Sequence, residues 1–390
     1  VGSEMCIRDR TYNDQPSGVY SSQVNDVVNF FNNELDQHLE LVAFISVRRF
    51  LKNRSVIKSE VPNATVLPIL PKAKYHGFSS LVFQMYCRFS KHRSVISRNV
   101  VATLIALSSK EKGAIEKVCY DGRGAIAAEW KEYDVVEDKK MVDAIHQQEN
   151  DSVLQSDHRI SVSTKLIDYW KKEFNYRSND HVIIPCTLST RISISLPDEQ
   201  DIQKIRNESG YTTKDIVLVY SGSTAGWQSF SKLRSVIEAW LSSNENIKIL
   251  FLSRPDQVIE DLMQRFTDRV SCKWVKPHEV RGQLLSCDHG IMYRDQSMTN
   301  KVAAPTKFAE YLSAGLNVLI SEGLGDYSEF VTAHNCGNVI LDNEQIELNR
   351  IDHAERQKNY GLAVKYFNKS SYKNEYLEII DKLNSKQENK

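Results

Sequence analysis

The chain has 390 residues, which is long for a single hydrophobic core and enough for two domains of about 180 residues each. Its composition, 41% hydrophobic and 26% charged, is typical of globular proteins. Because 50 basic and 50 acidic side chains balance, no net field attracts nucleic acid or an anionic membrane, and a nucleic-acid-binding protein is disfavoured.

The cysteines and histidines give no sign of a metal site. The seven cysteines occur singly, without a Cys-x-x-Cys pair, which fits a reducing cytoplasm better than a disulfide scaffold or a zinc site. None of the ten histidines has metal-ligand spacing, and no Asp-x-Asp pair occurs. No stretch approaches the roughly 20 apolar residues of a membrane helix. We therefore expect a cytoplasmic protein that holds no metal and associates with a membrane at most peripherally.

The first ten residues, Val1 to Arg10, lack the basic start and apolar middle of a signal peptide. They resemble translated sequencing-adapter DNA, so we expect residues 1–10 to be non-native and the native chain to begin near Thr11. The strand expected before Gly18 then retains almost no apolar residues, and the native N-terminus stays undetermined.

The region from residue 11 to residue 190 alternates between helices and short strands. Apolar residues from Val24 to Phe31 recur at helical spacing. Strand-like runs, most of them rich in Val and Ile, follow at Leu39 to Val47, Thr65 to Leu70, Ser94 to Ser97, Lys117 to Tyr120, Arg159 to Val162 and Val182 to Ile184. Short strands between helices predict parallel βαβ units, and thus an α/β domain with a Rossmann-like doubly wound sheet.

A polar, proline-broken stretch between Leu188 and Asp201 is interpreted as an interdomain linker. Alternation then resumes over residues 200–370, which predicts a second Rossmann-like domain. Its expected strands are Ile216 to Ser221, Ile247 to Ser253, Arg269 to Trp274, Gly290 to Tyr293 and Asn317 to Ser321. Its expected helices include Phe230 to Leu241, Asp256 to Phe266 and Pro277 to Ser286. The last segment, residues 371–390, contains an amphipathic helix from Tyr372 to Leu383.

The stretch Ala304-Pro305-Thr306-Lys307-Phe308-Ala309-Glu310-Tyr311-Leu312-Ser313-Ala314-Gly315 organises the second domain. Proline at the first helical position and glycine past the last predict a helix of about three turns. The start of this helix attracts anions, because the free amides of Thr306 and Lys307 and the positive end of the helix dipole point in the same direction. Glu310, one turn on, could accept two ribose hydroxyls. The alternative is an ordinary helix in which Lys307 and Glu310 form a surface pair.

This stretch resembles the donor-binding segment of family 4 glycosyltransferases, retaining enzymes of the GT-B fold. The resemblance is specific in Pro305-Thr306-Lys307-Phe308, Glu310-Tyr311-Leu312 and Gly315-Leu316. It implies two Rossmann-like domains facing a cleft, a C-terminal helix returning to the first domain, and a nucleotide diphosphate sugar as co-substrate without a resident cofactor. One departure is Val302, where many members carry a glutamate near the transferred sugar. The residue that replaces it, within Arg294 to Lys301, is not identified by the sequence.

Ligands of open parallel sheets bind beyond the carboxyl ends of the strands, so the loops there are candidate sites. In the second domain, Gly222 allows close approach of backbone to phosphate and Ser223 can donate a hydrogen bond. Arg254 and Arg294 each follow a strand and can meet phosphate oxygens with a planar fork. The alternatives are a plain glycine turn and a solvated surface arginine. Lys276 lies in the loop where the family usually holds the nucleobase.

In the first domain, Asp121 and Arg123 close a strand in a loop that resembles the aspartate-arginine-glycine loop of polysaccharide-building members. Arg98 follows the preceding strand and is predicted at the same edge. An acid and two arginines there could position an acceptor hydroxyl and share the charge of a leaving diphosphate. The alternative is that Asp121 only caps the next helix. Ser21 and Gln23, in the opening loop, are predicted to contact the acceptor.

The predicted function is a retaining glycosyltransferase that moves a sugar from a nucleotide diphosphate to an acceptor hydroxyl. The expected acceptor is a saccharide or lipid-linked saccharide in cell-surface polysaccharide or lipopolysaccharide synthesis. A sugar-nucleotide epimerase of the same fold stays open, as does a catalytically inactive sugar-nucleotide-binding protein, which Val302 makes plausible. The sequence does not identify the sugar, the nucleobase, the acceptor, the linkage or the oligomeric state.

Overall fold

The computed structural model describes residues 17–69, 76–90, 93–135, 138–190, 195–222, 229–341 and 346–385. The chain divides into two compact units. The first unit comprises Val1–Arg191 and Lys369–Lys390, and the second comprises Ile192–Asn368. The boundary at residue 191 lies inside the polar stretch that the sequence suggested as a linker. The adapter-like residues 1–10 lie outside the described residues.

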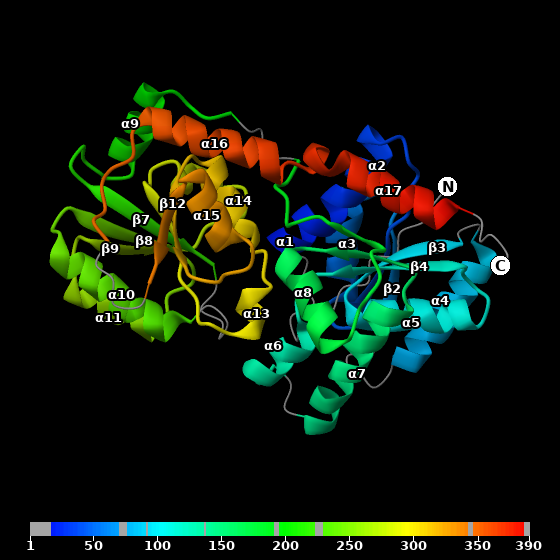
Figure 1. Cartoon of the computed structure of the whole chain (residues 1–390). Coiled ribbons are helices and arrows are strands. Elements are labelled where there is room, and N and C mark those ends of the chain that lie inside the picture. Colours follow the sequence, from blue (N-terminus) through cyan, green and yellow to red (C-terminus); the bar gives the residue numbers. More distant parts are fainter. Residues whose placement is uncertain are drawn as a thin grey trace. The chain divides into compact units, whose positions relative to one another are not determined.

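The first unit is an α/β unit with parallel strands (Figure 1). Its strands are β1 (Val42–Ser46), β2 (Thr65–Ile69), β3 (Ser94–Arg98), β4 (Lys117–Gly122), β5 (His158–Ser161) and β6 (His181–Ile183). Its helices are α1 (Gly18–Tyr20), the π-helix η1 (Ser21–Asn25), α2 (Asp26–Glu34), α3 (Phe50–Glu60), α4 (His76–Phe89), α5 (Val100–Glu111), α6 (Ile126–Glu132), α7 (Lys139–Gln155), α8 (Thr164–Glu173), the 3-10 helix η4 (Lys369–Tyr372) and α17 (Lys373–Asn384).

The strands of the first unit form two parallel ladders, β1–β2 and β3-β4-β5-β6, where the sequence predicted one doubly wound sheet. Both ladders nevertheless share the same two cores. Ala43 and Ile45 of β1 pack in one core with Ile96 of β3. Val42 and Phe44, which point to the other side of β1, pack with Val95 in the second core. Buried apolar residues on both faces of these strands explain their near-continuous hydrophobic sequences.

Helix α17 returns to the first unit, as predicted. Helix α17 lies beside α2 (Figure 1), its apolar side chains join the core that contains α2, and the Tyr376 ring lies 5.0 Å from the Phe31 ring. The hydroxyl of Ser94 donates to the Leu383 carbonyl at 2.9 Å. The ammonium of Lys117 donates to the carbonyls of Lys382 and Ser385 and so stabilises the carboxyl end of the helix.

The second unit is a six-stranded parallel sheet with strand order β12-β11-β10-β7-β8-β9 (Figure 1). Its strands are β7 (Ile216–Ser221), β8 (Ile247–Leu252), β9 (Val270–Lys273), β10 (His289–Met292), β11 (Asn317–Ser321) and β12 (Gly337–Ile340). Its helices are α9 (Glu199–Glu208), α10 (Phe230–Ser243), α11 (Gln257–Arg265), α12 (Val280–Leu284), α13 (Met298–Lys301), α14 (Thr306–Ser313), α15 (Tyr327–His334) and α16 (His353–Phe367). Counted from β7, this is the Rossmann order, and the topological switch point lies between β7 and β10.

Candidate functional site

Helix α14 begins beside the switch point of the second unit. Pro305 occupies the N-cap position with φ −64° and ψ 131°, so the helix starts at Thr306, one residue later than the sequence suggested. None of the described side chains caps this start. The positive end of the helix dipole and the first amides of α14 therefore point into the space in front of the helix start.

The opposite end of α14 is closed by Gly315, which has φ +77°. The amide of Leu316 donates to the Tyr311 carbonyl at 3.0 Å, and the amide of Gly315 donates to the Leu312 carbonyl at 2.9 Å. This pair of bonds is a Schellman motif, and it requires the left-handed conformation that glycine adopts without strain. The predicted glycine stop is thus correct.

Tyr311 fixes α14 against the sheet at the switch point. Its ring covers β10 so closely that a Cβ on Gly290 would lie 2.2 Å from it. Its phenol oxygen accepts a hydrogen bond from the Ser221 amide, at the end of β7, at 2.9 Å. The helix start and the carboxyl ends of the two central strands are therefore held in one arrangement.

Two cations of the second unit gather at this edge. The Lys307 ammonium lies 4.6 Å from the centre of the Tyr220 ring, and the residue is 9% exposed. Burial lowers the pKa of Lys307 well below its usual value, and the charge of Arg294 lowers it further. Arg294 is also buried, and its amide donates to the Ser321 hydroxyl at 3.1 Å. Buried positive charge of this kind is stabilised when an anion binds.

Glu310 completes the group as a half-buried acid. Burial raises its pKa above the usual value, while the nearby Lys307 lowers it. Glu310 and Lys307 are thus near enough for each charge to shift the pKa of the other. Because Lys307 is buried and Glu310 is half-buried, they do not form the solvated surface pair of the alternative interpretation. A partly desolvated carboxylate makes strong hydrogen bonds to hydroxyl groups.

The loop between β10 and α14 is organised by Asn300, a residue that the sequence did not single out. Asn300 is 1% exposed, and its amide nitrogen donates to the Asp295 carbonyl at 3.0 Å. Its carbonyl oxygen accepts from the Arg294 guanidinium at 3.3 Å. Val302, at the position of the family's first glutamate, is a buried core residue. Any polar contact to a sugar from this segment must come from its other residues.

The other predicted donor residues lie less centrally. Gly222 has φ +146°, which favours glycine, and Ser223 lies outside the described residues. Arg254 is exposed and stacks over the exposed Trp274 ring at 5.5 Å. Lys276 is exposed, and its amide donates to the Glu279 carboxylate at 2.7 Å. Among the described residues, neither Arg254 nor Lys276 contacts the cations around Tyr220.

In the first unit, Asp121 lies between two arginines. It is the register partner of Arg98 across β3 and β4, and Arg98 donates to its carboxylate at 3.1 Å. Arg123 donates through Nη2 at 2.9 Å, and its Nε lies 2.8 Å from the other carboxylate oxygen. Burial alone would lower the pKa of Arg123, but the Asp121 charge reverses the shift and raises it. The structure brings these three predicted residues together.

Asp121 does not cap the following helix, which was the alternative interpretation. Helix α6 has Ala125 at its N-cap, and the amide of Ala127 donates to the Glu149 carboxylate of α7 at 2.7 Å. Glu149 is fully buried, and burial raises its pKa to about 8. The cap of α6 thus comes from a residue 22 positions later.

The predicted acceptor contacts of the opening loop have other partners in the structure. The Gln23 amide is buried, donates to the Thr187 carbonyl at 2.6 Å and accepts from the Thr187 amide at 3.3 Å. The Gln23 carbonyl accepts from Arg98 at 3.0 Å. The Ser21 hydroxyl donates to Glu60 at 2.7 Å. This geometry gives Gln23 a positioning role beside Arg98 and leaves the half-buried Ser21 the more accessible of the two.

Lys369 is a further cation that sequence reasoning missed. It is fully buried in the first unit, where its ammonium donates to the Leu188 carbonyl at 2.7 Å. Burial lowers its pKa to about 8, and the charges of Arg123 and Arg98 act in the same direction, whereas Asp26 opposes them. No local pattern marks this residue, because only the return of the chain into the first unit brings it there.

Within the described part of the chain, no three His, Cys, Asp or Glu side chains gather as potential metal ligands. A helix long and apolar enough to cross a membrane is likewise absent from that part.

Known proteins show what this fold is similar to. No protein-family model matches the sequence, and no curated protein matches it. Sucrose-phosphate synthase from Thermosynechococcus elongatus has a similar structure, with TM-score 0.69 and 11% identity over 98% of this chain and 99% of that chain. HepE from Anabaena, solved with UDP and glucose, gives TM-score 0.69 and 11% identity over 98% and 100%. WaaG, a glycosyltransferase involved in lipopolysaccharide biosynthesis, gives 0.64 and 12% over 98% and 100%. At these identities the likeness shows the fold, and the predicted GT-B fold class is confirmed.

Proposed function

We propose that the protein is a glycosyltransferase that moves a sugar from a nucleotide diphosphate onto an acceptor hydroxyl, with retention at the anomeric carbon. The observation that carries the proposal is the group of Lys307, Arg294 and Glu310 beside the start of α14, at the switch point of the second sheet. Two buried cations and a helix start suit a diphosphate, and the acid behind them suits a ribose. HepE, which has a similar fold, binds UDP and glucose.

Different residues of the second unit would bind different parts of the donor. The first amides of α14, with Thr306 and Lys307, would bind the diphosphate, and Arg294 would add a planar fork. Glu310 would accept the ribose hydroxyls. Gly222 would let the β7 loop approach the phosphates, while the exposed Arg254 and Lys276 suit the outer, nucleobase side of the donor.

The residues of the first unit would act on the acceptor and the leaving group. Arg98 and Arg123 share one carboxylate, so this group carries an excess positive charge that can stabilise developing negative charge. Asp121 holds both guanidinium groups in place and could accept a hydrogen bond from the attacking hydroxyl. Departure of the diphosphate and attack on the same sugar face would then be assisted by the leaving phosphate, with helix dipole and arginines in place of a metal ion.

The acceptor is proposed to be a saccharide or a lipid-linked saccharide of a cell-surface polymer. WaaG, a solved structure of similar fold, takes part in lipopolysaccharide synthesis, which supports this choice. The polar Asp121 group suits a hydroxyl acceptor rather than an apolar one.

The experiment is a thermal-shift screen with UDP-, GDP- and ADP-sugars, followed by product analysis with and without saccharide acceptors. The proposal predicts one preferred sugar nucleotide and an acceptor-dependent product whose anomeric configuration, read by NMR, matches the donor. Isomerised sugar nucleotide without an acceptor would instead identify an epimerase. Binding without hydrolysis or transfer would identify an inactive binding protein.

A further inference from the structure

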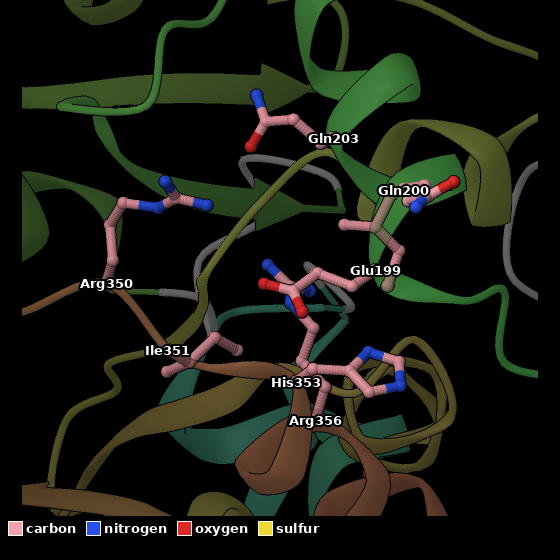
Figure 2. A pocket seen from close by; sticks show the side chains of 8 residues that line it. Glu199, Gln200, Gln203, Arg350, Ile351, His353 and Arg356 are labelled. Carbon is pink, nitrogen blue, oxygen red and sulfur yellow. The ribbon is translucent and has the colours of Figure 1, made fainter.

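The second unit has a cavity at the end of the sheet opposite to the donor edge. Its volume is about 250 Å³. Its lining comes from the first turns of α9 and α16 and from the segment that precedes α16, including Glu199, Gln203, Arg350, His353 and Arg356 (Figure 2). The cavity has room for a small metabolite rather than for a nucleotide sugar.

Three nitrogen atoms in this lining are buried and have no hydrogen-bond partner among the described residues. They are Arg350 Nε, His353 Nδ1 and Arg356 Nη1. Arg356 Nη1 is the strongest indication of a ligand, because the whole residue is only 2% exposed. Burying a polar atom without a partner is unfavourable, so such atoms are normally satisfied by a ligand or by water.

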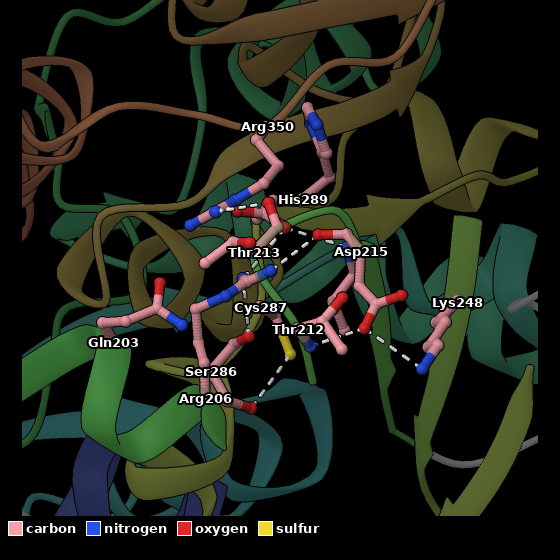
Figure 3. A network of polar contacts seen from close by, with 12 residues as sticks. Gln203, Arg206, Thr212, Thr213, Asp215, Lys248, Ser286, Cys287, His289 and Arg350 are labelled. Atoms are coloured by element: carbon pink, nitrogen blue, oxygen red, sulfur yellow. Dashed lines mark hydrogen bonds and ion pairs between the residues drawn. The ribbon is translucent and has the colours of Figure 1, made fainter. Parts of the chain in front are cut away.

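Guanidinium groups gather at and behind the cavity, and Figure 3 shows those of Arg206 and Arg350. The buried Asp288 carboxylate pairs with both Arg206, at 3.0 Å, and Arg356, at 3.1 Å. Arg350 adds a third guanidinium, whose Nη1 is bonded only to the Thr213 carbonyl at 2.7 Å. The lining also contains the carboxylate of Glu199, and Asp198 and Asp352 are sequence neighbours of lining residues. Of the three guanidinium groups, only that of Arg350 has no ion pair among the described residues.

The starts of α9 and α16 are already capped by aspartate side chains, so neither helix start is open to an anion. Asp198 accepts from the Asp201 amide at the start of α9, and Asp352 accepts from the Glu355 amide at the start of α16. An anion in the cavity would thus meet side chains, not helix dipoles.

We propose that this cavity binds a small metabolite that carries a phosphate or carboxylate group together with hydroxyls. Arg350, Arg356 and His353 bind the anionic group, while Glu199 and Gln203 accept hydrogen bonds from the hydroxyls. The site is separate from the donor site, because Asp288 precedes β10 whereas Arg294 follows it, at opposite ends of the same parallel strand. The inference does not depend on the proposed transfer reaction.

The test is a melting-temperature measurement of the full chain with inorganic phosphate, glycerol 3-phosphate or citrate at about 10 mM, with glycerol as the uncharged control. A site that binds with a Kd near 1 mM should raise Tm by about 3 °C. A response to the two phosphates alone identifies the phosphate source, and a response to citrate alone identifies the carboxylate source. Glycerol should have no effect. No response to any of the three anions would overturn the proposal.

Variants test whether the anion that raises Tm binds in this cavity. Arg350→Gln and Gln203→Glu should each abolish it, the first by removing a cation and the second by adding a negative charge without a change of shape. Arg265→Gln, at an exposed arginine of α11, is the matched control and should respond like wild type. Lys307→Met removes a donor-site cation, and it should also keep the response. A shift that persists in Arg350→Gln, or disappears in Lys307→Met, would place the anion elsewhere and overturn the site.

Discussion

The phenol oxygen of Tyr311 accepts a hydrogen bond from the Ser221 amide at 2.9 Å, although the two residues are 90 positions apart. This bond ties α14 to the end of β7. Tyr311→Phe keeps the ring over Gly290 but leaves a partly buried amide without its partner, so we expect a loss of about 1–3 kcal/mol in the free energy of unfolding. Urea denaturation measures this loss, and nucleotide titration should show weaker binding because the Gly222 loop loses its anchor.

The matched control is Tyr169→Phe. Tyr169 is buried in the first unit, and its hydroxyl has no hydrogen bond with any residue that the structure describes. This substitution should change stability by no more than about 0.5 kcal/mol. Equal effects of the two substitutions would show that the Tyr311 bond contributes nothing beyond ring packing.

Glu310 and Lys307 test the donor site. Glu310→Gln keeps the shape and removes the charge, so nucleotide affinity should fall by roughly 1.5–3 kcal/mol, the value of a charged hydrogen bond. Lys307→Ala should weaken binding of a nucleoside diphosphate more than binding of the nucleoside alone. Calorimetric titration measures both effects, with Lys365→Ala, at an exposed lysine of α16, as the control. Unchanged affinity in both variants would make α14 a purely structural helix.

The sequence predicted those elements whose signals are local. Strands β7 and β11 were located almost to the residue, because each is an uninterrupted apolar run. Helix α14 carries proline and glycine at its two ends. By contrast, β12 begins with Gly337 and has only two apolar residues, and the apolar residues of α16 follow no clear helical stripe. Strand β12 is held by its neighbour in the sheet, and α16 is held by α14. Such contacts between distant parts of the chain cannot be predicted from local sequence.

The candidate site shows the same difference between residues marked by local sequence and residues that depend on distant contacts. Arg98 and Asp121 could be predicted at one edge because both end neighbouring strands, and the structure makes them register partners. Asn300 and Lys369 could not, since their importance depends on burial among residues distant in sequence. Gln23 was predicted to contact the acceptor, but its amide is engaged by the Thr187 backbone. A polar residue in a loop sequence does not reveal whether the fold already uses its hydrogen bonds.

Glu149 predicts a pH dependence of stability. Burial raises the pKa of its carboxyl from 4.5 to about 8 in the folded protein. Because the folded state favours the protonated form, the contribution to stability is complete below about pH 4.5 and is lost as pH rises toward 8. Glu149→Gln removes this titration and keeps an oxygen for the Ala127 amide. The difference in unfolding free energy between wild type and variant should therefore shift with pH, by at most about 5 kcal/mol.

Chemical denaturation at pH 5, 6.5 and 8 checks this prediction, since a comparison of the two proteins cancels titrations that they share. Wild type should lose stability relative to Glu149→Gln across this range. A constant difference would mean that the buried carboxyl is ionised throughout.

Arg123 tests whether the Asp121 group acts on the reaction. If its guanidinium stabilises charge that develops only in the transition state, Arg123→Ala should lower turnover by roughly 10²–10³-fold while nucleotide affinity stays near wild type. Arg123→Lys keeps the charge but loses the two-point contact with Asp121, and should recover only part of the rate. Added guanidinium ion should partly restore the alanine variant and leave the lysine variant unchanged. Asp121→Asn would release both arginines and should lower turnover and stability together. Wild-type turnover from Arg123→Ala and Asp121→Asn with a competent acceptor would remove the catalytic role from this loop and assign it to the segment from Arg294 to Lys301.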